Sequence, residues 1–292
     1  MSANKRNPLL TAIIGASALA ACVSPGPAQT QDRPLRAELP VRAAPTYADL
    51  VDLALASELV AVVLVDEQIV VPPERAPDVA PGSVRLYVES LTQRLLAAPG
   101  AMGESVTFLV DQQRDAKGDA PELEELSFVF FGATVPGQPG FAQLLSSDSL
   151  FPADPVIEER VRRVLTQLAA ADALPPVTGV KDVISVPGNL AGESETQLFI
   201  ETDSRAPLSI SVIRRPGAAP EWGLSLGEIV DQNARPPERE TIAWYRLACE
   251  LPSDLADDAF LQSDRESQDR ARADYAFVQA QLGPCERRLP QM

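Results

Sequence analysis

The sequence predicts an α+β protein, with a β-rich N-terminal domain shaped as a barrel or a sandwich, followed by a β-meander and C-terminal helices closed by a disulfide. Short runs rich in valine, isoleucine and phenylalanine recur along the chain, which favours strands. Two longer amphipathic patterns, at residues 154–174 and 263–282, favour helices. The apolar fraction of 45% is enough to build a core and excludes general disorder.

The N-terminal segment has the pattern of an export signal. A basic head that includes Lys5 and Arg6 precedes an apolar stretch from Pro8 to Leu19. That stretch is shorter than the roughly 20 apolar residues that a membrane-spanning helix needs. The run Leu-Ala-Ala-Cys that ends at Cys22 resembles the lipobox of bacterial lipoproteins. The resemblance implies that residues 1–21 are removed and that Cys22 carries lipid, including palmitate.

Residues 22–45 are expected to form a tether, because they hold five prolines and little apolar periodicity. In lipoproteins an aspartate after the acylated cysteine tends to retain the protein at the inner membrane. Position 23 is valine, so the same resemblance implies an outer-membrane anchor that faces the periplasm.

Residues 46–153 are predicted to form the β-rich domain. Thr46 can cap a helix that reaches Ala56. The run from Leu59 to Val65 is β-branched and almost continuous, as expected for a strand buried on both faces, and it resumes at residues 69–71. Residues 91–97 fit a helix or a strand equally well. The other expected strands are 84–89, 105–110, 127–131 and 141–145.

Five such strands, with a polar loop at residues 111–125 between the third and the fourth, resemble small closed barrels of the oligonucleotide/oligosaccharide-binding type. A sandwich and an open sheet fit the same pattern. The resemblance is one of strand pattern and implies no binding residues.

Residues 154–174 are predicted to form a linking helix. Asp154 is a suitable N-cap, Pro155 fits the first helical position, and acidic residues follow near the positive end of the helix dipole. The prolines after Leu174 are expected to end it.

Residues 175–292 are predicted to form the meander and two helices. The expected strands are 177–186, 197–201, 208–214 and 222–230. One helix is expected from Pro236 to Cys249, and a capping box of Ser263 and Glu266 is expected to start the other. The runs at 187–192, 243–249 and 282–285 resemble uncharacterised exported proteins of alphaproteobacteria, which implies no activity.

The cysteine content agrees with export. If Cys22 carries lipid, Cys249 and Cys285 remain as an even pair in an oxidising compartment, and we expect them to form a disulfide. The alternative, a redox-active pair, lacks the Cys-x-x-Cys spacing that such pairs usually have.

The sequence excludes the commonest catalytic arrangements, because the chain has no histidine. No Ser-x-x-Lys motif precedes Lys117 or Lys181. We therefore predict no catalytic residue and no cofactor. Carboxylates crowd the polar loop and offer a weak candidate site for a hard cation, with a solvated acidic loop as the alternative. The candidate ligands are Asp111, Asp115 and Asp119.

Charge and anchor together suggest the class of function. A net charge of −16 disfavours nucleic acid as a partner. We expect a non-enzymatic binding or envelope-assembly module, attached to the membrane by lipid, with an envelope protein or glycan as its partner. The alternatives are a carboxylate-dependent hydrolase of envelope glycans and a structural spacer. Trp222, Trp244 and Tyr245 could stack on a ligand, although their spacing also fits core positions.

Overall fold

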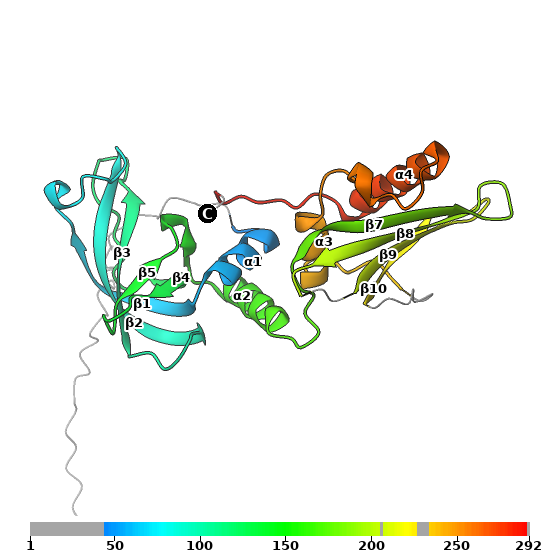
Figure 1. The fold of residues 1–292 in the computed structure, drawn as a ribbon. Coiled ribbons are helices and arrows are strands. Elements are labelled where there is room, and N and C mark those ends of the chain that lie inside the picture. Colours follow the sequence, from blue (N-terminus) through cyan, green and yellow to red (C-terminus); the bar gives the residue numbers. More distant parts are fainter. Residues whose placement is uncertain (1–43, 205–206, 227–233, 291–292) are drawn as a thin grey trace, which may run out of the picture. The chain divides into compact units, whose positions relative to one another are not determined.

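The computed structural model describes residues 44–204, 207–226 and 234–290 (Figure 1). The expected signal segment, Cys22 and all but the end of the expected tether lie outside these residues. As predicted, the described chain is a mixed α+β protein with two antiparallel sheets. None of its described helices is both long and apolar enough to cross a membrane. The helices are α1 (Tyr47–Ala56), α2 (Pro155–Leu168), α3 (Ile242–Glu250), α4 (Arg265–Leu282) and the short 3-10 helices η1 (Pro73–Arg75), η2 (Ser147–Ser149) and η3 (Asp257–Ala259).

The first sheet curls into a half-barrel. Its strands are β1 (Leu59–Val70), β2 (Ser83–Ala97), β3 (Ser105–Gln113), β4 (Ser127–Thr134), β5 (Ala142–Leu144) and β6 (Leu150–Pro152). The order is β3-β2-β1-β4-β5, and β6 pairs with β4. The outer strands β3 and β5 meet at an isolated parallel bridge between Thr107 and Phe141. There the Thr107 N–H donates to the Gly140 carbonyl at 2.8 Å.

The first part of β1, from Leu59 to Val65, is buried on both faces, as its sequence predicts, whereas Ile69 and Val70 at its end are exposed. Leu59 and Val63 point into the barrel interior, while Val60 and Val62 belong to the second core, which includes α1 and α2. This division follows from the alternation of side chains along a strand. β1 is therefore the wall that the two cores share.

The structure settles one open question about the first sheet and adds one strand that the sequence did not predict. Residues 91–97, which fitted a helix or a strand, continue β2, because β1 pairs with them as far as Ala97. The short strand β6 was not expected. Its three residues pair with Phe128, Val129 and Phe130 of β4 and are too few to give a periodic pattern.

Helix α2 begins as predicted and ends early. The Asp154 side chain accepts the N–H groups of Val156 and Ile157 at 2.8 and 3.0 Å. The helix ends at Leu168 instead of near Leu174. A turn follows it, and Leu174 then enters the second core, where it is 6% exposed. Leu174 is apolar because it is buried in the second core, so the prediction that the helix extends to this residue was wrong.

The second sheet is the predicted meander. Its strands pair in chain order: β7 (Val177–Pro187), β8 (Ser194–Thr202), β9 (Leu208–Arg214) and β10 (Glu221–Leu226). Residues 227–230, the end of the last expected strand, lie outside the described residues. Figure 1 shows α4 lying along this sheet, and α4 contacts β7 and β8. The expected inner face of α4 is buried, namely Ala271, Tyr275, Val278 and Leu282.

The starts of α3 and α4 correct the sequence prediction. α3 begins at Ile242, not at Pro236, because Glu240 has a φ of 57°, a backbone conformation that a helix cannot contain. The Thr241 hydroxyl then accepts the Trp244 N–H and caps the helix. In α4 the cap is Asp264, one residue after the expected Ser263, and its carboxylate accepts the Ser267 N–H at 2.8 Å.

A buried carboxylate joins α4 to the second sheet. Asp274 is fully buried, and its two oxygens bond Arg214 Nε of β9 and Thr196 Oγ1 of β8, both at 2.5 Å. Thr196 in turn bonds the Ser185 hydroxyl of β7. A carboxylate satisfied in this way fixes the helix against three strands, and its loss leaves buried donors without an acceptor.

We predict that Asp274→Ala lowers the free energy of unfolding by about 3 kcal/mol, because it removes the fully buried carboxylate to which both Thr196 and the half-buried Arg214 are bonded. Urea unfolding followed by circular dichroism measures this change. The control is Asp269→Ala, which alters an exposed carboxylate on the same helix and should change stability little. Equal effects of the two substitutions would contradict this role for Asp274.

Candidate functional site

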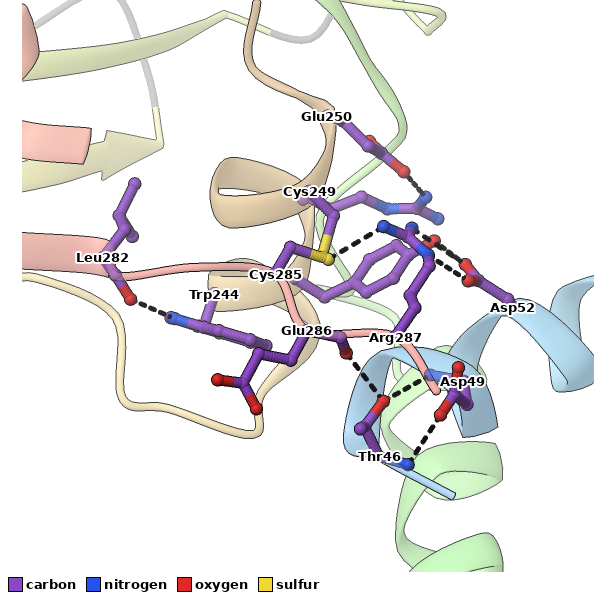
Figure 2. The surroundings of a disulfide bond; sticks show 12 residues. Thr46, Asp49, Asp52, Trp244, Cys249, Glu250, Leu282, Cys285, Glu286 and Arg287 are labelled. Carbon is purple, nitrogen blue, oxygen red and sulfur yellow. Dashed lines mark hydrogen bonds and ion pairs between the residues drawn. A yellow bond between two sulfur atoms is a disulfide. The ribbon is translucent and has the colours of Figure 1, made fainter. Parts of the chain in front are cut away.

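The predicted disulfide is confirmed. Cys249, at the end of α3, is bonded to Cys285, which follows α4, across a sequence separation of 36 residues (Figure 2). The Trp244 indole N–H also donates to the Leu282 carbonyl, at 2.9 Å. The disulfide and this hydrogen bond therefore hold the segment that follows α4 against α3.

After the disulfide, residues 285–289 form a segment that we call the C-terminal strap, which lies against α1 (Figure 2). The Asp49 carboxylate accepts the backbone N–H groups of Arg288 and Leu289, at 3.1 and 3.2 Å. Arg287 Nε donates to Asp52 Oδ2 at 2.5 Å. The Thr46 hydroxyl, which also caps α1, donates to the Glu286 carbonyl at 2.8 Å. The beginning and the end of the described chain are thus held together.

Two side chains at the strap, Tyr245 and Arg287, have raised pKa values. Burial raises the pKa of Tyr245 well above its ordinary value of 10, and the hydrogen bond from its hydroxyl to Asp52 raises it further. The hydrogen bond from Arg287 to Asp52 raises the pKa of Arg287 as well. Tyr245 therefore remains neutral and Arg287 remains charged across the physiological pH range.

A cavity of about 450 Å³ adjoins the strap and has carboxylates in its wall. Asp49 is only 2% exposed and its oxygens accept N–H groups of Thr46, Arg288 and Leu289. Asp52 is bonded to Arg287 and Tyr245. A glycosidase needs one acid that faces the substrate and donates a proton to it. These two carboxylates hold the strap instead.

The three candidate metal ligands do not form one cluster, although Asp115 and Asp119 bond each other across a turn. Asp111 lies in β3 and bonds Arg85 Nε at 2.7 Å. Asp115 accepts the N–H groups of Asp119 and Lys117 at 2.9 and 2.8 Å, and these bonds lower the pKa of its carboxyl. Within the described residues, no cluster of three or more histidine, cysteine, aspartate or glutamate side chains could hold a metal ion.

The three aromatic residues considered for stacking lie in the core. Trp222, Trp244 and Tyr245 are 7%, 6% and 4% exposed and belong to the second core. The positions of these residues on α3 and β10 are therefore core positions, which was the alternative to ligand stacking.

A groove of about 530 Å³ lies over β3 and β5, which lie side by side. Beyond the bridge of Thr107 with Phe141, the two strands have no further paired residues. The groove is lined by parts of β2, β3, β5 and the turn before β5, including Arg85, Tyr87, Thr107, Phe108, Leu109, Asp111, Gln138, Phe141 and Leu144. Its volume falls within the range of roughly 300–1,000 Å³ that is usual for binding pockets.

The groove has an apolar rim, an apolar floor and a fixed charged cluster. Leu109 and Phe141 at the rim are 49% and 39% exposed, although both are large apolar side chains. The buried Phe108 of the barrel interior also lines it. Arg85 forms salt bridges with Asp78 and Asp111 at 3.0 and 2.7 Å. The hydrogen bonds that Arg85 donates to these carboxylates, those to Asp111 most of all, raise the pKa of Arg85 and keep it charged.

This arrangement can bind but shows no activated nucleophile. Asp111 was a candidate residue from the sequence, whereas Leu109 and Phe141 were missed. A signal for Leu109 was present. Residues 106, 108 and 110 are the inward positions of β3, so Leu109 stands among the outward positions, where an alternating strand usually has polar residues.

A scan against protein-family models finds no match to this chain, and a search of curated proteins finds none either. The groove is therefore interpreted from its geometry and chemistry.

We predict that the double substitution Cys249→Ser and Cys285→Ser lowers the free energy of unfolding by about 4 kcal/mol, the chain-entropy estimate for this loop length. Urea unfolding of the oxidised protein measures the change. Wild-type protein treated with a reductant should lose a similar amount of stability, and the double variant should not respond to the reductant. Unchanged stability of the double variant would show that the disulfide does not hold the strap.

Proposed function

We propose that this chain is a lipid-anchored, non-enzymatic binding module of the bacterial cell envelope. In this proposal the lipid on Cys22 attaches it to the outer membrane, residues 22–45 are the tether, and the described residues face the periplasm. An envelope protein or an envelope glycan is the partner that the half-barrel binds.

The groove between β3 and β5 is the observation that carries the proposal. It combines two exposed apolar side chains, Leu109 and Phe141, with a charged cluster whose geometry is fixed by two salt bridges. Apolar surface with a few fixed polar groups is the usual composition of a binding site. Asp49 and Asp52 near the strap are engaged in holding the chain, so these two carboxylates give the hydrolase alternative no support.

Two features support the proposed location at the outer membrane, facing the periplasm. The residues Leu19 to Cys22 have the lipobox pattern, and at about 3.1 Å per residue a proline-rich tether of residues 22–45 could span on the order of 70 Å. The bond between Cys249 and Cys285 is of a kind that persists in oxidising compartments such as the periplasm.

The charge of the chain supports a partner other than nucleic acid. A net charge of −16 repels phosphate backbones at long range. The same charge favours encounter with partners that carry basic groups.

Site-specific photo-crosslinking in living cells tests the proposal. A photoreactive residue at position 109 or 141 is expected to give discrete adducts, because both side chains are exposed in the groove. The control is position 156 on α2, where the valine is 68% exposed and lies outside the groove. Cys22→Ser is expected to abolish palmitate labelling and to reduce the adduct yield.

The same adducts at all three positions, or none at positions 109 and 141, would contradict the binding role. Palmitate labelling that persists in the Cys22→Ser variant would contradict the anchor.

A further inference from the structure

A cavity of about 540 Å³ lies where the start and the end of the described chain meet. Its wall includes Ala44 and Pro45 from the start of the described chain, and Pro284, Glu286 and Arg288 from the segment that follows α4. Among the described residues, it shares no lining residue with the groove over β3 and β5. The cavity is therefore a second place at which a ligand could bind.

Three arginines from three segments line this cavity. Arg160 comes from α2, Arg239 from the segment before α3, and Arg288 from the C-terminal strap. Within the described residues, none of the three forms a salt bridge with a carboxylate. Acidic residues outnumber basic ones in this chain, 41 to 25, so most arginines have a carboxylate within easy reach. Three that meet in one cavity without such a partner indicate a site for an anion.

Hydrogen bonds to the backbone fix two of these arginines. Arg160 Nη1 donates to the Pro45 carbonyl at 2.9 Å, and Arg288 Nη1 donates to the Ala44 carbonyl at 3.1 Å. A guanidinium group has five N–H donors, so one such bond leaves others for a ligand.

Packing fixes the third arginine. The Arg239 guanidinium lies against Gly283, the residue that follows α4. A Cβ atom added at Gly283 would be 2.2 Å from Arg239 Nη2. The cationic groups of the cavity are thus positioned by the fold before any ligand binds.

Two glutamates also line the cavity and reduce its positive charge. Glu240 forms a salt bridge with Arg163 at 3.8 Å, so its charge is partly neutralised. Glu286 forms no salt bridge with any other described residue, and its carboxylate is an unfavourable neighbour for an anion. With three arginines and two glutamates, the described wall carries a net charge of +1, in a chain whose net charge is −16.

The number of donors selects a phosphate group. The planar guanidinium group pairs bidentately with the oxygens of a carboxylate or a phosphate. A carboxylate offers two oxygens, whereas a phosphate monoester offers three and carries close to two negative charges. Three guanidinium groups around one cavity therefore match a phosphate monoester better than a carboxylate.

We propose that the cavity lined by Arg160, Arg239 and Arg288 binds a phosphate monoester, either as free phosphate or as the head group of a membrane lipid. Ala44 and Pro45, the end of the proposed tether, lie in its wall, so the cavity is at the point where the tether joins the described chain. The lipid source rests on the proposed lipid anchor, whereas the binding of phosphate does not.

The negative charge of the whole chain is compatible with this site. At physiological ionic strength the Debye length is about 8 Å, so charges on distant parts of the surface are largely screened. The arginines of the cavity act on the ligand at hydrogen-bond distance. Local attraction therefore outweighs the long-range repulsion once a phosphate group is in the cavity.

Isothermal titration calorimetry with inorganic phosphate tests the site, on the purified full chain carrying Cys22→Ser so that no lipid is attached. Arg239→Gln is expected to weaken phosphate binding at least about tenfold, because it removes a charged hydrogen-bond donor. Arg239 holds no backbone carbonyl within the described chain, so its loss should disturb the fold little. The matched control is Arg265→Gln, which removes the same charge from an exposed position on α4 and should leave binding unchanged.

A substitution that strengthens binding gives a second test, because a chain that folds poorly cannot produce a gain. Glu286→Gln removes the unpaired carboxylate from the wall and is expected to tighten phosphate binding about threefold. The matched control is Glu104→Gln, an exposed position before β3 that lies outside this wall.

Vesicles identify the source of the phosphate. Co-sedimentation with vesicles that contain phosphatidic acid, whose head group is a phosphate monoester, and not with phosphatidylcholine vesicles would support a lipid head group. Binding of inorganic phosphate without co-sedimentation would support free phosphate.

Absence of phosphate binding by the chain with its arginines intact would overturn the proposal, and so would equal losses in Arg239→Gln and Arg265→Gln. Failure of the proposed anchor would show separately, as palmitate labelling that does not depend on Cys22.

Discussion

The incomplete closure of the half-barrel is the constraint on which the functional interpretation depends. One bridge, between Thr107 and Phe141, brings the two outer strands together, and the chain then leaves β5 after only three residues. A closed barrel has no free edge, whereas this sheet keeps part of β3 unpaired by another described strand. Native proteins usually protect the edge strands of a sheet against pairing with other chains. Here the outer strands border a groove with exposed apolar side chains, Leu109 and Phe141, which is a composition that suits a binding site.

The rest of the described chain shows how a free edge is covered when it is not used. On the outer edge of β7, the Leu261 N–H bonds the Val183 carbonyl, and the Gln262 side chain bonds both the N–H and the C=O of Ser185. This edge is therefore satisfied by the chain itself. Backbone groups of the C-terminal strap are satisfied in a similar way, because the Asp49 carboxylate of α1 accepts the N–H groups of Arg288 and Leu289.

The sequence predicted most of the architecture because its strongest signals are local. The continuous apolar run from Leu59 predicted a strand buried on both faces, and the even pair of cysteines predicted the disulfide. Helix ends were less predictable, since the positive φ at Glu240 and the early end of α2 depend on tertiary packing. The groove could not be predicted, because it is formed by residues of β2, β3 and β5, which are distant in the sequence. Leu109 was the one residue whose outward position carried a usable signal.

Photo-crosslinking from position 141, compared between the chain with Leu109 and a Leu109→Asp variant, tests the groove most directly. The account predicts that the variant loses its adducts, because the substitution places a charge on the apolar rim that contacts the partner. A variant that folds normally and keeps all its adducts would show that the rim does not contact the partner, and the account of this groove as a binding site would be wrong.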